Sequence, residues 1–339
     1  MANQPKQDIT IEVQNLVKRY PKASANAVDD ISFSVPRGEI FGLLGPNGAG
    51  KTTTIGVLTT GILPTSGKAF LTGIDVAADP MNVKQRIAVV PQQSNLDRSL
   101  RAREILTFHA SYHGVPRAER NARADALLKE LGLGDRAKEK VLYYSGGMAQ
   151  RLMLARALMH SPDVLFLDEP TNNLDPQSRL FLWDRIRTLH ERGATILLTT
   201  HDMFEADQLC DRIAIMDHGK VLVLDTATEL KKMIPGGTFL ELRVALPERV
   251  LAAQSSTSAK SDLLESLRAI SATIKVEEMQ GDEQQSDTTT FRIYDQNASS
   301  LTVDAVQAVA SFGAEVRDMH VARPSLEDVF IYLTGRSLR

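Results

Sequence analysis

The hydrophobic positions in the first two thirds of the chain predict strands that alternate with helices. Residues 8–20 and 28–35 alternate apolar and polar side chains, which is typical of half-exposed, antiparallel strands. Further runs are apolar at consecutive positions, as expected for strands covered on both faces by helices; these are 39–45, 86–92, 164–170, 194–202 and 212–224. The pattern predicts an α/β core with a mainly parallel sheet and an antiparallel β subdomain.

The pattern changes between about residues 96 and 160. Apolar side chains there recur at helical spacing, in residues 100–114, 117–133 and 146–160. We therefore expect an α-helical insertion into the α/β core.

A second change follows Pro235, Gly236 and Gly237, which interrupt the periodic pattern. Beyond them the chain alternates strand and helix patterns in the order βαββαβ, with a final helix at 325–335 and a polar turn at 280–287. This is the split-βαβ order of a ferredoxin-like domain. We predict two domains, 1–235 and 236–339, of which the second is a small α+β domain.

Size and composition limit the class of protein. A chain of 339 residues with 43 % hydrophobic residues can form two domains, each with its own core. The net charge of −3 gives no overall basic surface, so we expect no nucleic-acid partner. The single cysteine, Cys210, excludes an internal disulfide and suits a reducing compartment.

No run of eighteen apolar residues occurs, and residues 1–10 are polar. We therefore expect a cytoplasmic protein with no membrane span and no signal peptide. Any role at a membrane would depend on a partner.

The stretch GPNGAGKT carries the strongest chemical signal, because it fits the phosphate-loop pattern G-x-x-x-x-G-K-[ST] without a gap. Its glycines let backbone N–H groups turn towards phosphates, and the following helix N-terminus favours an anion. The lysine adds a positive charge, and Thr52 can bind Mg²⁺. We expect the nucleotide to bind Gly45, Pro46, Asn47, Gly48, Ala49, Gly50, Lys51, Thr52 and Thr53.

Two further motifs narrow the chemistry. Asp168 and Glu169 follow an apolar strand, at the sheet edge where α/β proteins bind ligands. Asp168 can hold Mg²⁺, and Glu169 can act as the base for an attacking water. Ser145, Gly146 and Gly147 precede a long helix and leave its N-terminus open as a second anion site. Because one phosphate loop already binds the nucleotide, this second site suggests a phosphate supplied by another copy.

From about Tyr20 to about Lys220 these motifs, in this order, resemble the nucleotide-binding subunit of ATP-binding-cassette (ABC) proteins. The resemblance implies ATP and Mg²⁺ as cofactors, and a homodimer in which Ser145–Gly147 of one subunit contacts the ATP of the other. It implies that His201 is a switch residue near the γ-phosphate, that Asp175 lies in the loop crossing between subunits, and that Tyr20 stacks on adenine. The alternatives are a loop histidine at 201 and core packing at Tyr20.

The resemblance also assigns Gln92 to the loop that senses Mg²⁺ and water and that links to the membrane partner. Gln93 is adjacent, and we choose Gln92 because it directly follows Pro91. The metal set is then Thr52, Gln92 and Asp168, with Glu169, His201 and Gln92 as the catalytic set.

Some positions depart from the usual family pattern, including Tyr144 for leucine, Met148 for glutamine and Arg101 for threonine. The variant Tyr-Ser-Gly-Gly-Met, and the segment at 323–336, resemble daunorubicin-resistance-type (ABC-2) exporters. The resemblance implies an ABC nucleotide-binding domain at 1–235 and an accessory or regulatory domain at 236–339.

It also implies an ATPase subunit that powers export of a drug, lipid or polysaccharide through an integral membrane permease. Such a subunit would lie on the cytoplasmic face of the inner membrane. The alternative is a non-transport ABC ATPase of translation or DNA repair, although the chain has one cassette and no zinc cysteines. A phosphate-loop kinase would not need Ser145–Gly147 or His201. The second domain would support the dimer or, alternatively, sense a ligand.

Overall fold

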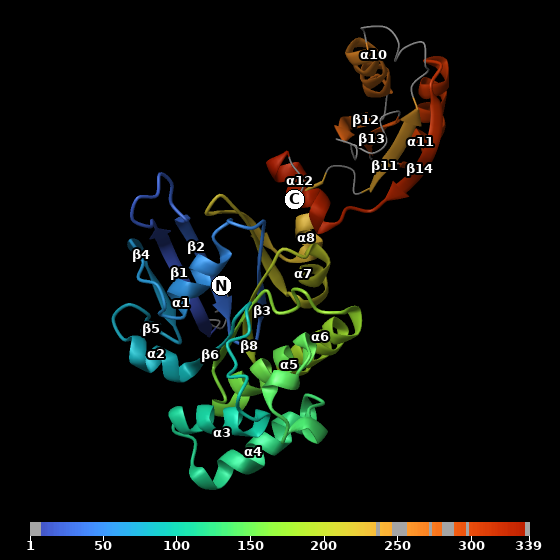
Figure 1. The fold of residues 1–339 in the computed structure, drawn as a ribbon. Helices are drawn as coiled ribbons and strands as arrows, with labels where there is room; N and C mark the ends of the chain where they lie inside the picture. The colour runs from blue at the N-terminus through green and yellow to red at the C-terminus, as the bar shows by residue number, and fades with distance from the viewer. Residues whose placement is uncertain are drawn as a thin grey trace, which may run out of the picture. The chain divides into compact units, whose positions relative to one another are not determined.

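The computed structural model describes residues 8–234, 238–245, 256–270, 273–279, 288–295 and 298–335. The chain divides into two compact units, one up to Ala227 and one from Thr228 (Figure 1). The expected turn at 280–287 and the interruption at 235–237 lie outside the described residues.

The first unit is organised around a six-stranded sheet. Its order is β10-β9-β3-β8-β7-β6, and β9, β3, β8, β7 and β6 pair in parallel. The bounds are β3 Ile40–Leu44, β6 Ile87–Val90, β7 Val164–Asp168, β8 Thr195–Thr200, β9 Arg212–Asp217 and β10 Lys220–Asp225. Every residue of β3, β7 and β8 is buried, which explains their consecutive apolar positions. The mainly parallel core is as predicted.

The apolar run at 212–224 is divided into two strands, although its length suggests one. β9 turns into β10 and the two pair antiparallel. The turn residues His218 and Gly219 have φ values of 46° and 80°, as a two-residue hairpin of type I′ requires.

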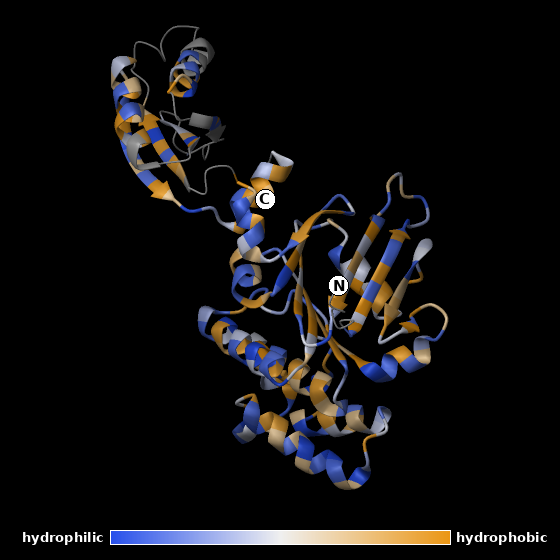
Figure 2. Ribbon diagram, turned by 180° about the vertical axis from the view of Figure 1, so that it is seen from behind, coloured by the Kyte–Doolittle hydropathy of each residue, from blue (hydrophilic) through white to orange (hydrophobic). Residues whose placement is uncertain are grey.

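A second, antiparallel sheet lies beside the first, as the alternating pattern predicted. Its order is β2-β1-β4-β5, with β1 Ile9–Lys18, β2 Val28–Pro36, β4 Ser66–Leu71 and β5 Ile74–Asp75. Hydrophobic and hydrophilic colours alternate along these strands in Figure 2. Their inward side chains share a core with Phe41 and Phe166 of the parallel sheet. Helices α1 (Lys51–Leu58) and α2 (Pro80–Arg86) also contribute to this core.

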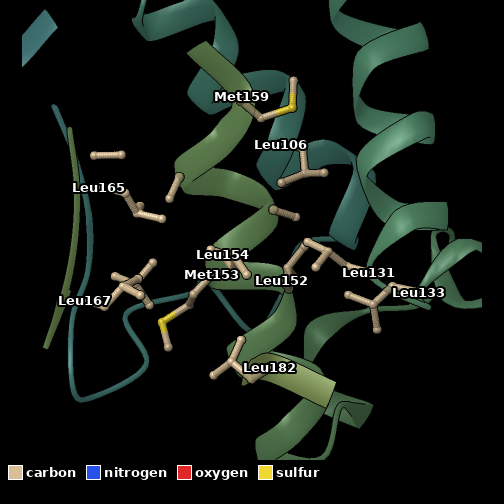
Figure 3. Packing of buried hydrophobic residues seen from close by; sticks show 14 of the residues in the cluster. Leu106, Leu131, Leu133, Leu152, Met153, Leu154, Met159, Leu165, Leu167 and Leu182 are labelled. Carbon is tan, nitrogen blue, oxygen red and sulfur yellow. The ribbon is translucent and has the colours of Figure 1, made fainter. Parts of the chain in front are cut away.

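The helical insertion consists of α3 (Ala102–Tyr112), α4 (Arg117–Glu130) and α5 (Gly146–Ala157), with the short helices η1 (Gly134–Arg136), η2 (Val141–Tyr143) and η3 (Leu158–His160). Leu106, Leu131 and Leu152 pack between these helices, and Met153 and Leu165 continue the core towards β7 (Figure 3). Helices α6 (Pro176–Glu191) and α7 (Met203–Leu209) complete the first unit. The insertion is therefore joined to the sheet by one continuous core.

The second unit contains an antiparallel sheet of order β12-β13-β11-β14. Its elements are α8 (Ala227–Lys232), β11 (Thr238–Ala245), α10 (Ser256–Arg268), β12 (Thr273–Met279), β13 (Thr288–Asp295), α11 (Ala298–Ser311), β14 (Glu315–Ala322) and α12 (Leu326–Thr334). Leu263 of α10 and Leu301 of α11 share a core with Leu242 and Phe291 of the sheet.

Candidate functional site

The glycines of the phosphate loop are required by close packing. The loop joins the end of β3 to the start of α1. A Cβ atom at Gly45 would lie 2.2 Å from the Met216 carbonyl oxygen, and one at Gly50 would lie 2.5 Å from that of Ala27. Gly50 also has a φ of 103°, a conformation that L-residues rarely adopt. Only glycine allows the backbone to turn this tightly at both positions.

Lys51 is held inside this loop and is only 4 % exposed. Its ammonium group donates to the carbonyl oxygens of Gly45, at 2.6 Å, and Pro46, at 3.1 Å. Glu169 Oε1 lies 3.6 Å from the same nitrogen. Burial lowers the pKa of Lys51, whereas the charges of Glu169 and Asp168 act in the opposite direction. The cation is therefore placed where the loop would receive phosphate oxygens.

The carboxyl ends of four neighbouring parallel strands meet at this edge of the sheet. β3 leads into the phosphate loop and β7 ends at Asp168, while Gln92 and His201 follow closely after β6 and β8. The four segments are far apart in sequence, and sheet order brings them together.

Asp168 faces the first turn of α1. Its Oδ1 accepts a hydrogen bond from Thr52 Oγ1 at 3.4 Å and another from Thr199 Oγ1 at 2.6 Å. Thr199 Oγ1 also accepts from the Glu169 N–H at 3.1 Å. A carboxylate and a hydroxyl this close form an all-oxygen pair, which fits the ligand preference of Mg²⁺.

The Glu169 carboxylate is the point where the site residues converge. Gln92 Nε2 donates to its Oε2 at 2.9 Å and Asn172 Nδ2 at 3.2 Å, while His201 Nδ1 lies 3.3 Å from the same oxygen. Gln92 makes this contact although the residue, like Gln93, is largely exposed. The Glu169 backbone has a φ of 46°, which is uncommon outside glycine and is held by the surrounding bonds.

The Ser145–Gly147 segment lies on a different part of the unit. Ser145 caps α5 by accepting a hydrogen bond from the Met148 N–H at 3.3 Å. A Cβ atom at Gly146 would meet nothing within 4 Å, so the helix N-terminus is open there. Helix α5 stands apart from α1 in Figure 1. The structure therefore does not bring this segment to the phosphate loop of its own chain.

Asp175 caps α6 by accepting a hydrogen bond from the Ser178 N–H at 2.9 Å. Its hydrogen bonds to Ser178 lower the pKa of its carboxyl. The side chain of Ser178 in turn faces Gly147, which links the start of α6 to the start of α5.

Tyr20 lies beside the first turn of α1. Its hydroxyl is 3.4 Å from Thr53 Oγ1, and the residue is 40 % exposed. The Lys18 ammonium group lies 5.3 Å from the ring centroid. The ring is thus accessible next to the phosphate loop.

Sequence reasoning missed Thr199 and Asn172, which contact the two acidic residues, and it also missed Glu205. Glu205 is 1 % exposed, and its Oε1 accepts from Thr171 Oγ1 at 2.7 Å and from Trp183 Nε1 at 2.9 Å. Burial raises the pKa of Glu205. Thr199 is one of three threonines in β8, so the strand carried polar positions but nothing singled this one out, and nothing local marked Asn172 or Glu205.

A phosphate loop facing an acidic pair across a parallel sheet, with a helical insertion and an antiparallel subdomain, defines a nucleotide-binding ATPase of the ABC class. Residues 28–172 match the protein family described as ABC transporter. Two solved structures are similar to this chain. An ATP-binding subunit of an ABC transporter has a TM-score of 0.61 and 32 % identity, covering 66 % of this chain and 92 % of that one. A dimeric, post-hydrolysis ATP-binding cassette bound to ADP and Pi has a TM-score of 0.59 and 27 % identity, covering 64 % of this chain and 98 % of that one.

Three curated relatives match over nearly their whole length. The daunorubicin/doxorubicin resistance ATP-binding protein DrrA of Streptomyces peucetius is 39 % identical, covering 96 % of this chain and 92 % of the relative. The linearmycin resistance ATP-binding protein LnrL of Bacillus subtilis is 36 % identical, covering 97 % and 99 %. The Nod factor export ATP-binding protein I of Ralstonia nicotianae is 37 % identical, covering 97 % and 95 %.

The chain belongs to the ABC transporter ATP-binding proteins of the DrrA drug-resistance, ABC-2 exporter type. It is the ATP-binding subunit of an ABC exporter, an ATPase coupled to transport, as the resemblance implied. A kinase or a non-transport ABC ATPase is therefore set aside. In the part of the chain that the structure describes, no helix is both long and apolar enough to cross a membrane.

Proposed function

We propose that this subunit binds ATP and Mg²⁺ between two copies of itself and uses hydrolysis to drive a membrane permease that exports a drug-like compound. The observation that carries the proposal is the Glu169 carboxylate. It contacts the Gln92 and Asn172 amides, the His201 ring and the Lys51 ammonium group in one small site.

In this proposal Glu169 accepts a proton from, or orients, the water that attacks the γ-phosphate. Gln92 and His201 hold that water and the carboxylate in place, and Lys51 binds the γ-phosphate oxygens. Thr52 and Asp168 would hold Mg²⁺, with Gln92 as a third ligand. The ion would neutralise charge on the phosphates when bound. Tyr20 would stack on adenine because its exposed ring lies beside α1.

Two copies are needed because Ser145–Gly147 forms an open helix N-terminus away from α1 (Figure 1). In the proposed homodimer this segment binds the γ-phosphate held by the partner's phosphate loop, and Asp175 lies in the loop that crosses between subunits. Hydrolysis removes the γ-phosphate that both copies bind, so the two copies can separate. A rigid-body opening of this kind can drive a membrane partner.

The membrane partner would be an integral permease seated near Gln92 and the helical insertion. The subunit would then lie on the cytoplasmic face of the membrane. Because the net charge is −3 and gives no overall basic surface, we expect no nucleic-acid partner. The names of the relatives refer to daunorubicin, doxorubicin and linearmycin resistance and to Nod factor export. We place the cargo in the drug class, with specificity in the permease and a lipid or polysaccharide cargo as the alternative.

We also propose that the second unit is ferredoxin-like and supports the dimer. β13 lies between β11 and β12, so the β11–α10–β12 crossover is split by an antiparallel strand. This is the arrangement of a split βαβ unit.

The proposal is tested with Glu169→Gln, which keeps the shape of the side chain and removes its basic carboxylate. We expect ATP hydrolysis to fall at least about 100-fold, because a general base contributes that much or more. ATP binding, measured by filter binding or calorimetry, should be retained. Glu191→Gln changes an exposed glutamate on α6 and serves as the matched control. Wild-type hydrolysis in Glu169→Gln would contradict the proposed role.

The permease and cargo are tested separately. Glu169→Gln with ATP and Mg²⁺ is used to capture partners from native membranes in mild detergent, followed by mass spectrometry. A polytopic membrane protein in equal amount supports the transport cycle and identifies the subunit that selects the cargo. Ribosomal or DNA-repair proteins instead would contradict it.

A further inference from the structure

Three of the seven histidines form a cluster outside the phosphate site. His109 lies in the last turn of α3, His113 follows the end of that helix, and His160 ends η3. One ring nitrogen from each lies within 4.8 Å of the others. The His113 and His160 rings are stacked at 4.0 Å, and His109 lies 4.4 Å from His113 between ring centroids.

The hydrogen bonds leave two ring nitrogens of the cluster without partners. His160 Nε2 lies 2.9 Å from the Ile87 carbonyl oxygen, which can only accept, so Nε2 carries the proton. His160 Nδ1 then holds a lone pair, and it is buried without a hydrogen-bond partner. His109 Nε2 is also buried and unpaired. An imidazole that donates one nitrogen to a backbone carbonyl and offers the other is typical of metal-binding histidines.

The spacing and protonation of the rings agree with this arrangement. His109 and His113 are separated by three residues, a common spacing for Zn²⁺ ligands. Burial lowers the pKa of all three rings, that of His109 to about 3, so they are neutral near pH 7. Neutral imidazole is the form that binds metals.

Two positive side chains face the cluster and oppose a cation. Arg156 lies near His109 and Arg123 near His160. Arg156 donates to Asn95 Oδ1 at 2.7 Å, and Arg123 donates to the Leu158 carbonyl oxygen at 3.1 Å. Among the described residues no carboxylate or thiol joins the three rings as a fourth ligand. Water would complete the coordination, and affinity should be lower than in a closed four-residue site.

We propose that His109, His113 and His160 bind one divalent transition-metal ion of the Zn²⁺ type. Zn–N bonds of about 2.0–2.1 Å require the rings to tilt out of their stack so that the nitrogens converge. The ion would fasten α3 to η3, which leads into β7, and His160 is bonded to the first residue of β6. These two strands lead to Asp168–Glu169 and Gln92, so the metal would stabilise the attachment of the helical insertion to the strands behind the ATP site.

The test uses the full chain without a histidine tag, with Mg²⁺ present and without nucleotide, which would itself bind metals. Co²⁺ is titrated and followed by its visible absorption, and Zn²⁺ is titrated by calorimetry. We expect one ion per chain, a Co²⁺ spectrum typical of tetrahedral nitrogen coordination, and displacement of Co²⁺ by Zn²⁺. His113→Gln should lower Zn²⁺ affinity at least about 10-fold. His218→Gln, at an exposed turn, should leave it unchanged.

His113 is chosen because it lies beyond the end of α3 and is half-exposed, so its replacement opens no core. Circular dichroism and ATP binding check that the variant folds. His160→Gln provides a second, independent change. The proposal is overturned if the wild type binds no ion, or if both variants bind with wild-type affinity. In the first case the stacked rings are only neutral packing groups.

Discussion

At the scale of single residues, one hydroxyl connects the two acidic residues of the site. Thr199 Oγ1 donates to Asp168 and accepts from the Glu169 N–H. We expect Thr199→Val to raise the Mg²⁺ concentration needed for half-maximal ATP hydrolysis. Asp168 Oδ1 would keep only the longer bond from Thr52, and the free energy of unfolding should fall by about 1–3 kcal/mol.

Thr195→Val is the matched control for that change. Thr195 lies on the same strand, is also buried, and its hydroxyl accepts from the Gly38 N–H at 2.9 Å. It pairs with Val164, at the opposite end of the β7–β8 pair from Asp168. It should lose similar stability without a change in Mg²⁺ dependence. An equal Mg²⁺ effect in both variants would show that Thr199 acts only through stability.

The buried Glu205 carboxyl predicts how the stability of the fold depends on pH. Burial raises its pKa above the ordinary 4.5, so the folded chain binds its proton more tightly than the unfolded chain. Its contribution to stability is therefore full below pH 4.5 and is lost as the pH rises through the raised value. Glutamine keeps the acceptor for Thr171 and Trp183 but cannot ionise.

We therefore expect the melting temperature of Glu205→Gln, relative to the wild type, to increase as the pH rises above 4.5. Calorimetry at matched ionic strength measures this difference. A difference that stays constant or falls over this range would mean that the buried carboxyl is not the source of the pH dependence.

At the scale of elements, the N-terminus of α5 contains two adjacent glycines with opposite surroundings. A Cβ at Gly147 would lie 2.4 Å from Ser178 Oγ, whereas one at Gly146 would meet nothing. Gly147→Ala should destabilise the cassette by about 1–3 kcal/mol, and Ser178→Ala should recover part of that loss. Gly146→Ala should leave the melting temperature unchanged or raise it, because alanine favours helix.

The same Gly146→Ala variant should slow ATP hydrolysis if its position contacts the partner's ATP. Melting curves and hydrolysis rates of both variants separate the two effects. Wild-type hydrolysis in Gly146→Ala would argue that the open N-terminus of α5 does not contact a nucleotide.

Elements with a strong local pattern were predictable, and elements fixed by tertiary contacts were not. The consecutive apolar positions of β3, β7 and β8 predicted the parallel sheet, and the helical spacing of apolar residues predicted α3, α4 and α5. The short strand β5 has two residues and no periodicity of its own, so only its pairing with β4 defines it. The β9–β10 hairpin was hidden because apolar residues continue on both sides of its turn.

The site residues also divide into those that the sequence predicts and those that it does not. The phosphate loop and Asp168–Glu169 are contiguous in sequence and carry their own chemistry, so both could be predicted. Asn172 lies only three residues from Glu169, but nothing local marked its contact, and the partners of Glu205 are distant in sequence, so neither residue was predicted. Glu205, for example, is held by Thr171 and Trp183 from other elements.

At the scale of the whole molecule, the proposed ATP site is one that a single chain cannot complete. The phosphate loop and the open N-terminus of α5 are both suited to phosphate, yet they stand apart in the same unit (Figure 1). Sharing ATP between two copies uses both sites and makes assembly depend on the γ-phosphate. In the proposed homodimer, symmetry would give two equivalent sites.

The most direct test co-expresses Lys51→Ala, which lacks the loop cation, with Gly146→Asp, which places a negative charge at the start of α5. Each variant alone should be inactive. A mixed dimer has one complete site, from the Lys51 of one chain and the Gly146 of the other. Random pairing should therefore restore about one quarter of wild-type hydrolysis. Wild-type hydrolysis by Gly146→Asp alone, or no activity in the mixture, would contradict the shared site.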